Sequence, residues 1–170
     1  MEAELKSKSD NYIQLQKNED IKRFYIRDYN GNETGEFLEF NLEDIELPLR
    51  YQKIIEDDKE NRRRLRDKLI IIDKQQDHKG KKLMSSNEEA KIKAVMDFYK
   101  REVEIYNAFL GERGIEKLLN GRELSWGTLA EIDTIIAKTI VPELKVSAKS
   151  IKEKIMNKYS NKNESSDVLE

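Results

Sequence analysis

The chain has 170 residues, a mass of 20.1 kDa and a formal charge of −2, with 32 basic and 34 acidic residues. It contains no cysteine, which excludes disulfides, thiolate nucleophiles and cysteine-based metal sites. The interspersed charges create no strong field for nucleic acid or an anionic membrane, and no apolar run approaches the roughly 20 residues of a membrane helix. We therefore expect a cytoplasmic protein that binds neither nucleic acid nor membranes.

The hydrophobic fraction is 37% and the charged fraction is 39%. This balance predicts one domain with a modest core and much solvated helix surface. Residues 1–21 are mostly polar and are expected to be poorly ordered, and residues 160–170 read as a disordered tail. The single domain is therefore expected to span residues 22–159.

A β-hairpin is predicted over residues 22–41, because the apolar period there is two. Phe24 and Ile26 alternate with polar neighbours, and Asn30-Gly31 is a turn dipeptide in which both residues tolerate positive φ. An isolated two-stranded hairpin is marginal in water. It should therefore pack on helices or pair with another copy, through residues that include Phe37 and Phe40.

A long helix is predicted from Leu49 to about Gln76, with Asp44 or Glu46 near its start. Its expected core stripe is interrupted by the charged run EDDKENRRR, so the middle of the helix should protrude or be only half covered. The core stripe of this helix is expected to consist of Tyr51, Ile54, Ile55, Leu65, Leu69 and Ile72. After the helix, His78 to Lys82 are expected to form a linker.

The next helix should start at a capping box formed by Ser86 and Glu89 and should end at Leu110. It is the most apolar helix of the chain and the expected centre of the fold. Its predicted face comprises Ile92, Val95, Met96, Tyr99, Val103, Tyr106 and Leu110, widened by Phe98, Ile105 and Phe109.

A tight corner follows this helix. Gly111 is placed for a left-handed C-cap, Gly114 opens a short helix to Leu119, and Gly121 closes it. The apolar residues around the corner are Phe109, Leu110, Ile115, Leu118 and Leu119.

A last helix should be capped by Ser125 and kinked or restarted by Pro142. Trp126 at its start favours core or cap packing and is also a reasonable interface anchor. The predicted fold is thus mainly α-helical, with about four main helices and a small N-terminal β-hairpin.

No catalytic constellation can be identified in the sequence. His78, the single histidine, lies in a linker without a predicted partner, and the cluster Arg62 to Arg66 is flanked by carboxylates at helix-pairing distance. We therefore predict no enzyme activity, no cofactor and no metal site.

Two stretches resemble a known family. FYKREVEIYNAFLGERGIEKLLNG, residues 98–121, and FYIRDYNGNETGEFLEFNLEDIELPLRY, residues 24–51, resemble the glycine corner and the opening hairpin of the tail assembly chaperones of long-tailed phages and phage tail-like particles. The similarity extends over about Phe24 to Leu144 and includes the final helix.

The resemblance implies a non-catalytic chaperone in the bacterial host cell that binds the tape measure protein and helps to recruit tail tube subunits. We expect self-association as well. The predicted contact residues are Phe37, Phe40, Phe109, Leu110, Ile115, Leu118, Leu119 and Trp126, with turns at Gly31, Gly111, Gly114 and Gly121. A small head–tail connector or tail completion protein is the alternative.

Overall fold

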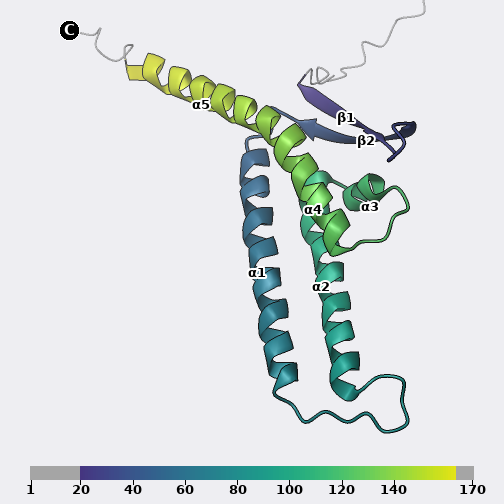
Figure 1. The fold of residues 1–170 in the computed structure, drawn as a ribbon. Helices are drawn as coiled ribbons and strands as arrows, with labels where there is room; N and C mark the ends of the chain where they lie inside the picture. Colours follow the sequence, from purple (N-terminus) through teal and green to yellow (C-terminus); the bar gives the residue numbers. More distant parts are fainter. Residues whose placement is uncertain (1–19, 164–170) are drawn as a thin grey trace, which may run out of the picture.

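The computed structural model describes residues 20–163, and its fold is mainly helical with an N-terminal β-hairpin, as predicted (Figure 1). The predicted poorly ordered segment lies outside the described residues except for Asp20 and Ile21. Of the predicted tail, residues 160–163 are helical in their backbone and the rest lies outside the described range. The elements are β1 (Ile21–Arg27), β2 (Glu33–Asn41), α1 (Leu47–Asp73), α2 (Ser86–Leu110), α3 (Gly114–Leu119), α4 (Trp126–Ile135), the π-helical turn η1 (Ile136–Ile140) and α5 (Val141–Asn163).

The antiparallel pair α1 and α2 forms the body of the molecule (Figure 1). In α1, the buried residues Leu47, Ile54, Asn61, Leu65 and Ile72 keep largely to a seven-residue spacing, which suits a long contact with a neighbouring helix. The predicted member Ile55 is exposed. The charged middle of α1 is partly covered, because Asn61 within it and Leu65 directly after it are buried.

The buried face of α2 is rotated from the predicted one. Ala94, Phe98 and Glu102 are buried, whereas Ile92 and Met96, predicted to be core, are exposed. The prediction counted only apolar residues, and a carboxylate occupies the middle of the true face.

The capping box of α2 lies one residue earlier than predicted. The Ser85 hydroxyl accepts from the Glu88 amide at 3.2 Å, and the Ser85 amide donates to the Glu88 carboxylate at 2.7 Å. The Ser86 hydroxyl instead accepts from the backbone N–H of His78 and donates to Asp77, which ties the α1–α2 loop to the helix.

The β-hairpin packs on the helices of its own chain, which is one of the two arrangements predicted for it. Phe24 of β1 pairs with Leu38 of β2, and the Phe40 ring lies 5.3 Å from the Phe109 ring of α2, centroid to centroid. Gly31 adopts a φ of 84° in the connecting turn, in agreement with the predicted turn.

The glycine corner is confirmed as two closely spaced helix ends, but its left-handed residues differ from those predicted. Gly111 ends α2 with an extended ψ of −179°, and Asn120, not Gly121, is the left-handed C-cap of α3. Gly114 is required for a different reason, because a Cβ there would lie 2.3 Å from the Leu110 Cβ.

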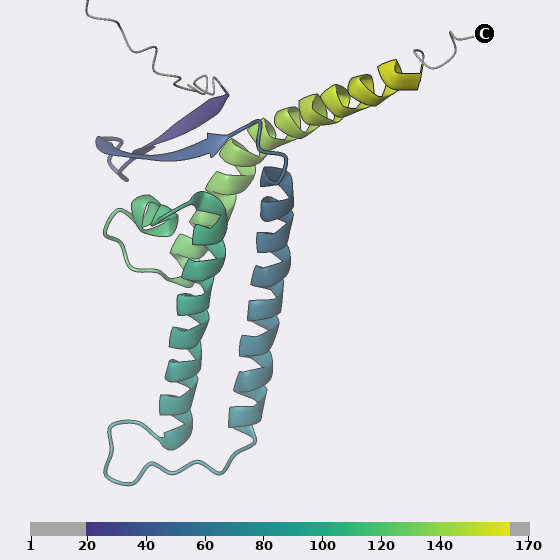
Figure 2. The same cartoon turned by 180° about the vertical axis from the view of Figure 1, so that it is seen from behind.

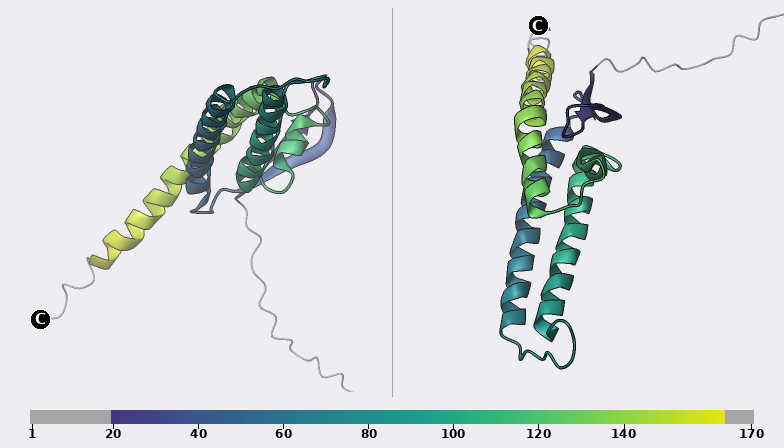
Figure 3. Two further views of the ribbon diagram at one scale, coloured as in Figure 1. Left: turned by 90° about the horizontal axis from the view of Figure 1, so that it is seen from below. Right: turned by 45° about the vertical axis from the view of Figure 1, so that its right-hand side comes forward.

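Helix α4, the turn η1 and α5 follow one another without a loop, and the helix changes direction near the start of α5, whose second residue is Pro142 (Figure 1). This bend agrees with the predicted kink. The Val141 amide donates to the Ile136 carbonyl, five residues back, and this π-helical turn lies immediately before the proline. The outer part of α5 extends away from the α1–α2 pair in every view (Figures 2 and 3).

Candidate functional site

Most of the predicted contact residues belong to the core. Phe40, Phe109, Leu110, Ile115 and Leu119 are all buried, so they offer no exposed contact surface while the β-hairpin stays packed on the helices. They are buried because the β-hairpin covers the glycine corner. The prediction left open whether the β-hairpin packs on the helices or pairs with another copy. In the fold the hairpin and the corner cover each other through contacts such as that between Phe40 and Phe109.

The other three predicted contact residues are at least partly accessible. Phe37 and Leu118 are half-buried, and the Trp126 side chain is 49% exposed. Lys117 donates to the Phe37 carbonyl at 3.3 Å and lies over its ring. Trp126 stacks on Phe98 with a centroid separation of 4.9 Å, so one of its faces packs on α2.

A polar cluster joins α1 to α2 in the middle of the core. The Glu102 side chain is completely buried, and its Oε1 accepts a hydrogen bond of 2.6 Å from Asn61 Nδ2. The same amide donates to the Phe98 carbonyl at 3.2 Å. Glu102 Oε2 has no hydrogen-bond partner among the residues that the structure describes.

The pKa of Glu102 is raised to about 7, chiefly by burial. The hydrogen bond from Asn61 opposes this shift, and the neighbouring Asp58 carboxylate contributes to it. A buried carboxyl group whose pKa lies near 7 is a common feature of catalytic acids. Here the group is sealed between two helices and has no access to a substrate. Its geometry indicates a structural role.

The cluster continues to α4 through Arg62. The Arg62 Nε donates to Asp58 at 2.7 Å, and its Nη2 lies 3.6 Å from an Asp133 oxygen. The Tyr106 hydroxyl donates to the same Asp133 carboxylate. Burial and Asp133 both raise the pKa of Tyr106, so it stays a protonated donor. The cluster therefore links α1, α2 and α4.

The arginine cluster of α1 is paired within the chain. Arg63 and Arg64 both bind Glu60, at 2.8 and 2.9 Å, and these bonds lower the pKa of Glu60 to about 2. The arrangement agrees with a solvated, self-compensated helix face. Among residues 20–163 there is no group of three histidine or acidic side chains placed to hold a metal ion.

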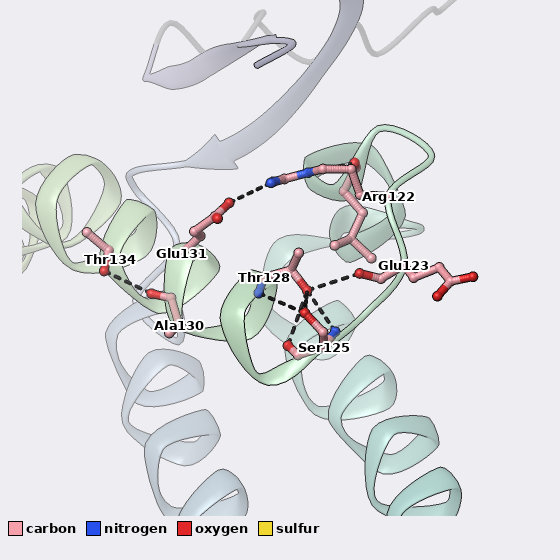
Figure 4. Close-up of polar contacts among 8 residues, drawn as sticks. Arg122, Glu123, Ser125, Thr128, Ala130, Glu131 and Thr134 are labelled. Carbon is pink, nitrogen blue, oxygen red and sulfur yellow. Dashed lines mark hydrogen bonds and ion pairs between the residues drawn. The ribbon is translucent and has the colours of Figure 1, made fainter.

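Two apolar hollows lie on the surface. The first, which we call the hairpin groove, has a volume of about 410 Å³ between the β-hairpin and helices α3 and α4. Tyr25 and Tyr29 on its wall are 72% and 86% exposed. Its other side includes Arg122, which pairs with Glu131 of α4 at 2.7 Å (Figure 4).

Figure 4 also shows how the start of α4 is fixed beside this groove. The Ser125 hydroxyl accepts from the Thr128 amide at 3.2 Å, and the Ser125 amide donates to the Thr128 hydroxyl at 2.8 Å. Ser125 is thus the N-cap that the sequence predicts. The groove therefore has one well-anchored helical wall.

The second hollow, which we call the arm groove, has a volume of about 380 Å³ between the β2–α1 connection and α5. Its lining includes Ile45, Val146 and Ile155, which are 66%, 70% and 46% exposed. Lys154 of α5 reaches across it to Glu43 at 3.2 Å. The spacing of apolar residues in α5 was visible in the sequence, but its lack of cover was not.

Comparisons of this chain with protein-family models, curated proteins and solved structures found no match. Within residues 20–163, no helix has the length and apolar character needed to cross a membrane.

Proposed function

We propose that this chain is a non-catalytic tail assembly chaperone of the long-tailed phage type, which binds the tape measure protein and helps to recruit tail tube subunits. The family resemblance of residues 24–51 and 98–121 motivates the proposal. The structure supports treating the two stretches as one unit, because Phe40 from the first packs on Phe109 from the second.

The observation that carries the proposal is the apolar surface that remains after the core is formed. Tyr25 and Tyr29 at the hairpin groove and Val146 at the arm groove are each at least 70% exposed. Moderate apolar patches bordered by charge favour repeated, reversible contacts over one tight site. Such contacts suit a protein that covers a long aggregation-prone chain and later leaves it.

The burial of the glycine corner changes where these contacts can form. Self-association through Phe109–Leu119 would require the β-hairpin to leave the core, because Phe40 packs on Phe109. We propose that the hairpin groove takes this role. Phe37, Leu118 and Trp126 are the predicted contact residues that can still contribute from the surface.

The test is co-expression with the tape measure protein of the same genome. We expect the soluble fraction of the tape measure protein to rise and the two proteins to co-elute. The variant Tyr25→Asp/Tyr29→Asp in the hairpin groove should weaken this effect, and Ile71→Asp, at an exposed site at the far end of α1, should not. An insoluble tape measure protein at every ratio, with no complex, would overturn the proposal.

A second measurement separates a chaperone from a connector or completion protein. A chaperone leaves when the tube polymerises, so the chain should be absent from purified particles by mass spectrometry. Stoichiometric presence in mature particles would refute the chaperone and favour the structural component.

A further inference from the structure

The outer half of α5 carries an apolar line between two rows of lysines. The line begins with Leu144, which is buried against the body, and continues through Ala148, Ile151 and Ile155 at three- or four-residue spacing. Ala148 and Ile151 are half-buried, and Ile155 is 46% exposed. The face that packs in the core at the start of α5 thus continues along the arm groove, where the β2–α1 connection covers it only in part. The outer part of α5 extends away from the α1–α2 pair (Figure 3).

The lysines lie on both flanks of this line. Lys145, Lys149 and Lys152 form one row, and Lys154 and Lys158 form the other. Between residues 144 and 158 there are five lysines and one glutamate. Of the five, only Lys154 makes an ion pair with a described residue.

An apolar seam bordered by charge is the arrangement by which helices select a partner helix. The seam supplies the buried area, and the flanking charges decide which partner is accepted. We infer that the outer half of α5, residues 145–158, docks an amphipathic helix of a partner protein whose apolar face is flanked by glutamate or aspartate.

A second copy of the chain fits this surface poorly. If two α5 helices pair antiparallel, each lysine row faces its own equivalent, and if they pair parallel, the two rows face each other. Either arrangement brings like charges together across the seam. An acidic helix neutralises both rows in either orientation.

Other anionic partners would contact only part of this surface, which combines an apolar line with two lysine rows. Phosphate groups would be bound by the lysines but would leave Ile151 and Ile155 without a role. A membrane surface requires a wider apolar face, typically with large aromatic residues, than one line of alanine and isoleucine. The combination of seam and flanks favours a protein helix.

The inference does not depend on the proposed function, because it concerns the chemistry of the partner and not its identity. The probe is a fluorescently labelled designed peptide of about 20 residues, three heptads with a leucine seam and glutamate flanks. A second peptide carries lysine at every flanking glutamate. Fluorescence anisotropy with the full chain measures both affinities at low and high salt.

We expect the glutamate peptide to bind at least about 10-fold more tightly than the lysine peptide, with a preference that falls as salt rises. The variant Lys149→Glu/Lys152→Glu should abolish this preference. Its matched control, Lys79→Glu/Lys81→Glu, makes the same charge change in the α1–α2 loop at the opposite end of the body and should leave binding unchanged.

Ile155→Asp should reduce binding of the glutamate peptide at least about 10-fold. Circular dichroism of each variant shows whether the fold is retained, and the loop control reports the effect of charge alone. Equal binding of the two peptides, or binding of neither, would overturn the inference.

Three further outcomes also overturn it. One is a dimer in sedimentation that Ile155→Asp dissociates, which would identify a second copy as the occupant. The others are binding of duplex DNA or of anionic vesicles that requires Lys149 and Lys152 in the absence of any peptide preference. A chain that binds the glutamate peptide but not the tape measure protein would retain this inference and lose the proposed function.

Discussion

The buried carboxyl group of Glu102 should make the stability of the protein fall as pH rises. Its pKa is about 7 in the folded chain against an ordinary 4.5, so the folded state binds the proton more tightly than the unfolded state. The stability conferred by the protonated form is fully present below about pH 4.5 and is lost as pH rises through about 7. Above that value the folded protein carries an ionised carboxylate with one unpaired oxygen.

The substitution Glu102→Gln removes this titration while retaining the shape of the side chain. The glutamine oxygen can still accept from Asn61, and its amide can donate toward Asp58. From the two pKa values, the free energy of unfolding of the native chain should fall by about 2 kcal/mol relative to the variant between pH 5 and pH 8. The variant should therefore be the more stable protein at pH 8.

Urea denaturation followed by circular dichroism, at intervals between pH 5 and pH 8, measures the difference directly. The control is Glu104→Gln, two residues away on the exposed face of α2, where the carboxylate pairs with Arg101 at 2.6 Å. The control should follow the native chain at every pH. If Glu102→Gln also ran parallel to the native chain, the pKa of Glu102 would be ordinary and the reasoning would be refuted.

Two other substitutions test the packing that holds α1, α2 and α3 together. Asn61→Leu should lower the free energy of unfolding by about 2 kcal/mol because Glu102 loses its donor, and adding Glu102→Met should restore most of the loss in the same urea assay. Gly114→Ala should lower the free energy of unfolding by about 2 kcal/mol or more, because the added Cβ would lie 2.3 Å from the Leu110 side chain. The control Gly127→Ala, whose Cβ would have its nearest contact at 3.8 Å, should be neutral or slightly stabilising. Thermal melts measure both.

The sequence predicts the fold class and most element boundaries because local signals decide them. The turn at Gly31 and the end of α2 at Gly111 lie at the predicted positions, although Gly111 is not the predicted left-handed cap, and the Ser125 cap is confirmed by its hydrogen bonds. The N-terminus of α2 was misplaced by one residue because both Ser85 and Ser86 offer a capping hydroxyl. The choice between them depends on Asp77, which binds Ser86 from the preceding loop.

The faces of the helices are harder to predict, because burial is decided by the partner and not by the helix alone. Glu102 lies between Phe98 and Ile105, at the spacing of the buried face, but a lone glutamate is ordinarily assigned to solvent. Only the placement of Asn61 opposite Glu102 makes its burial tolerable. Sequence pattern within α2 carries no information on Asn61, which lies 41 residues away.

Burial of the predicted contact residues could not be predicted for the same reason, because it depends on the segment that packs against them. Apolar character made Phe40 and Phe109 candidates for an exposed surface, but pattern alone does not show that two apolar segments cover each other. The uncovered residues, such as Tyr29 and Val146, are scattered in sequence and stand out only when the core is assembled. The π-helical turn before Pro142 was not predicted, because its hydrogen bond from Val141 to Ile136 has no signal in the sequence pattern.

The polar cluster around Glu102 and the proposed docking surface on α5 lie in different parts of the molecule, and this separation has a measurable consequence. The cluster around Glu102 fixes α1, α2 and α4, whereas the described buried residues of α5, Leu144 and Ser147, lie near its start. A partner docked on residues 145–158 therefore requires no change in the core. Peptide affinity should be the same for the native chain and for Glu102→Gln at pH 8, although their stabilities differ. A shift in affinity that followed the protonation of Glu102 would mean that α5 and the core form one coupled unit.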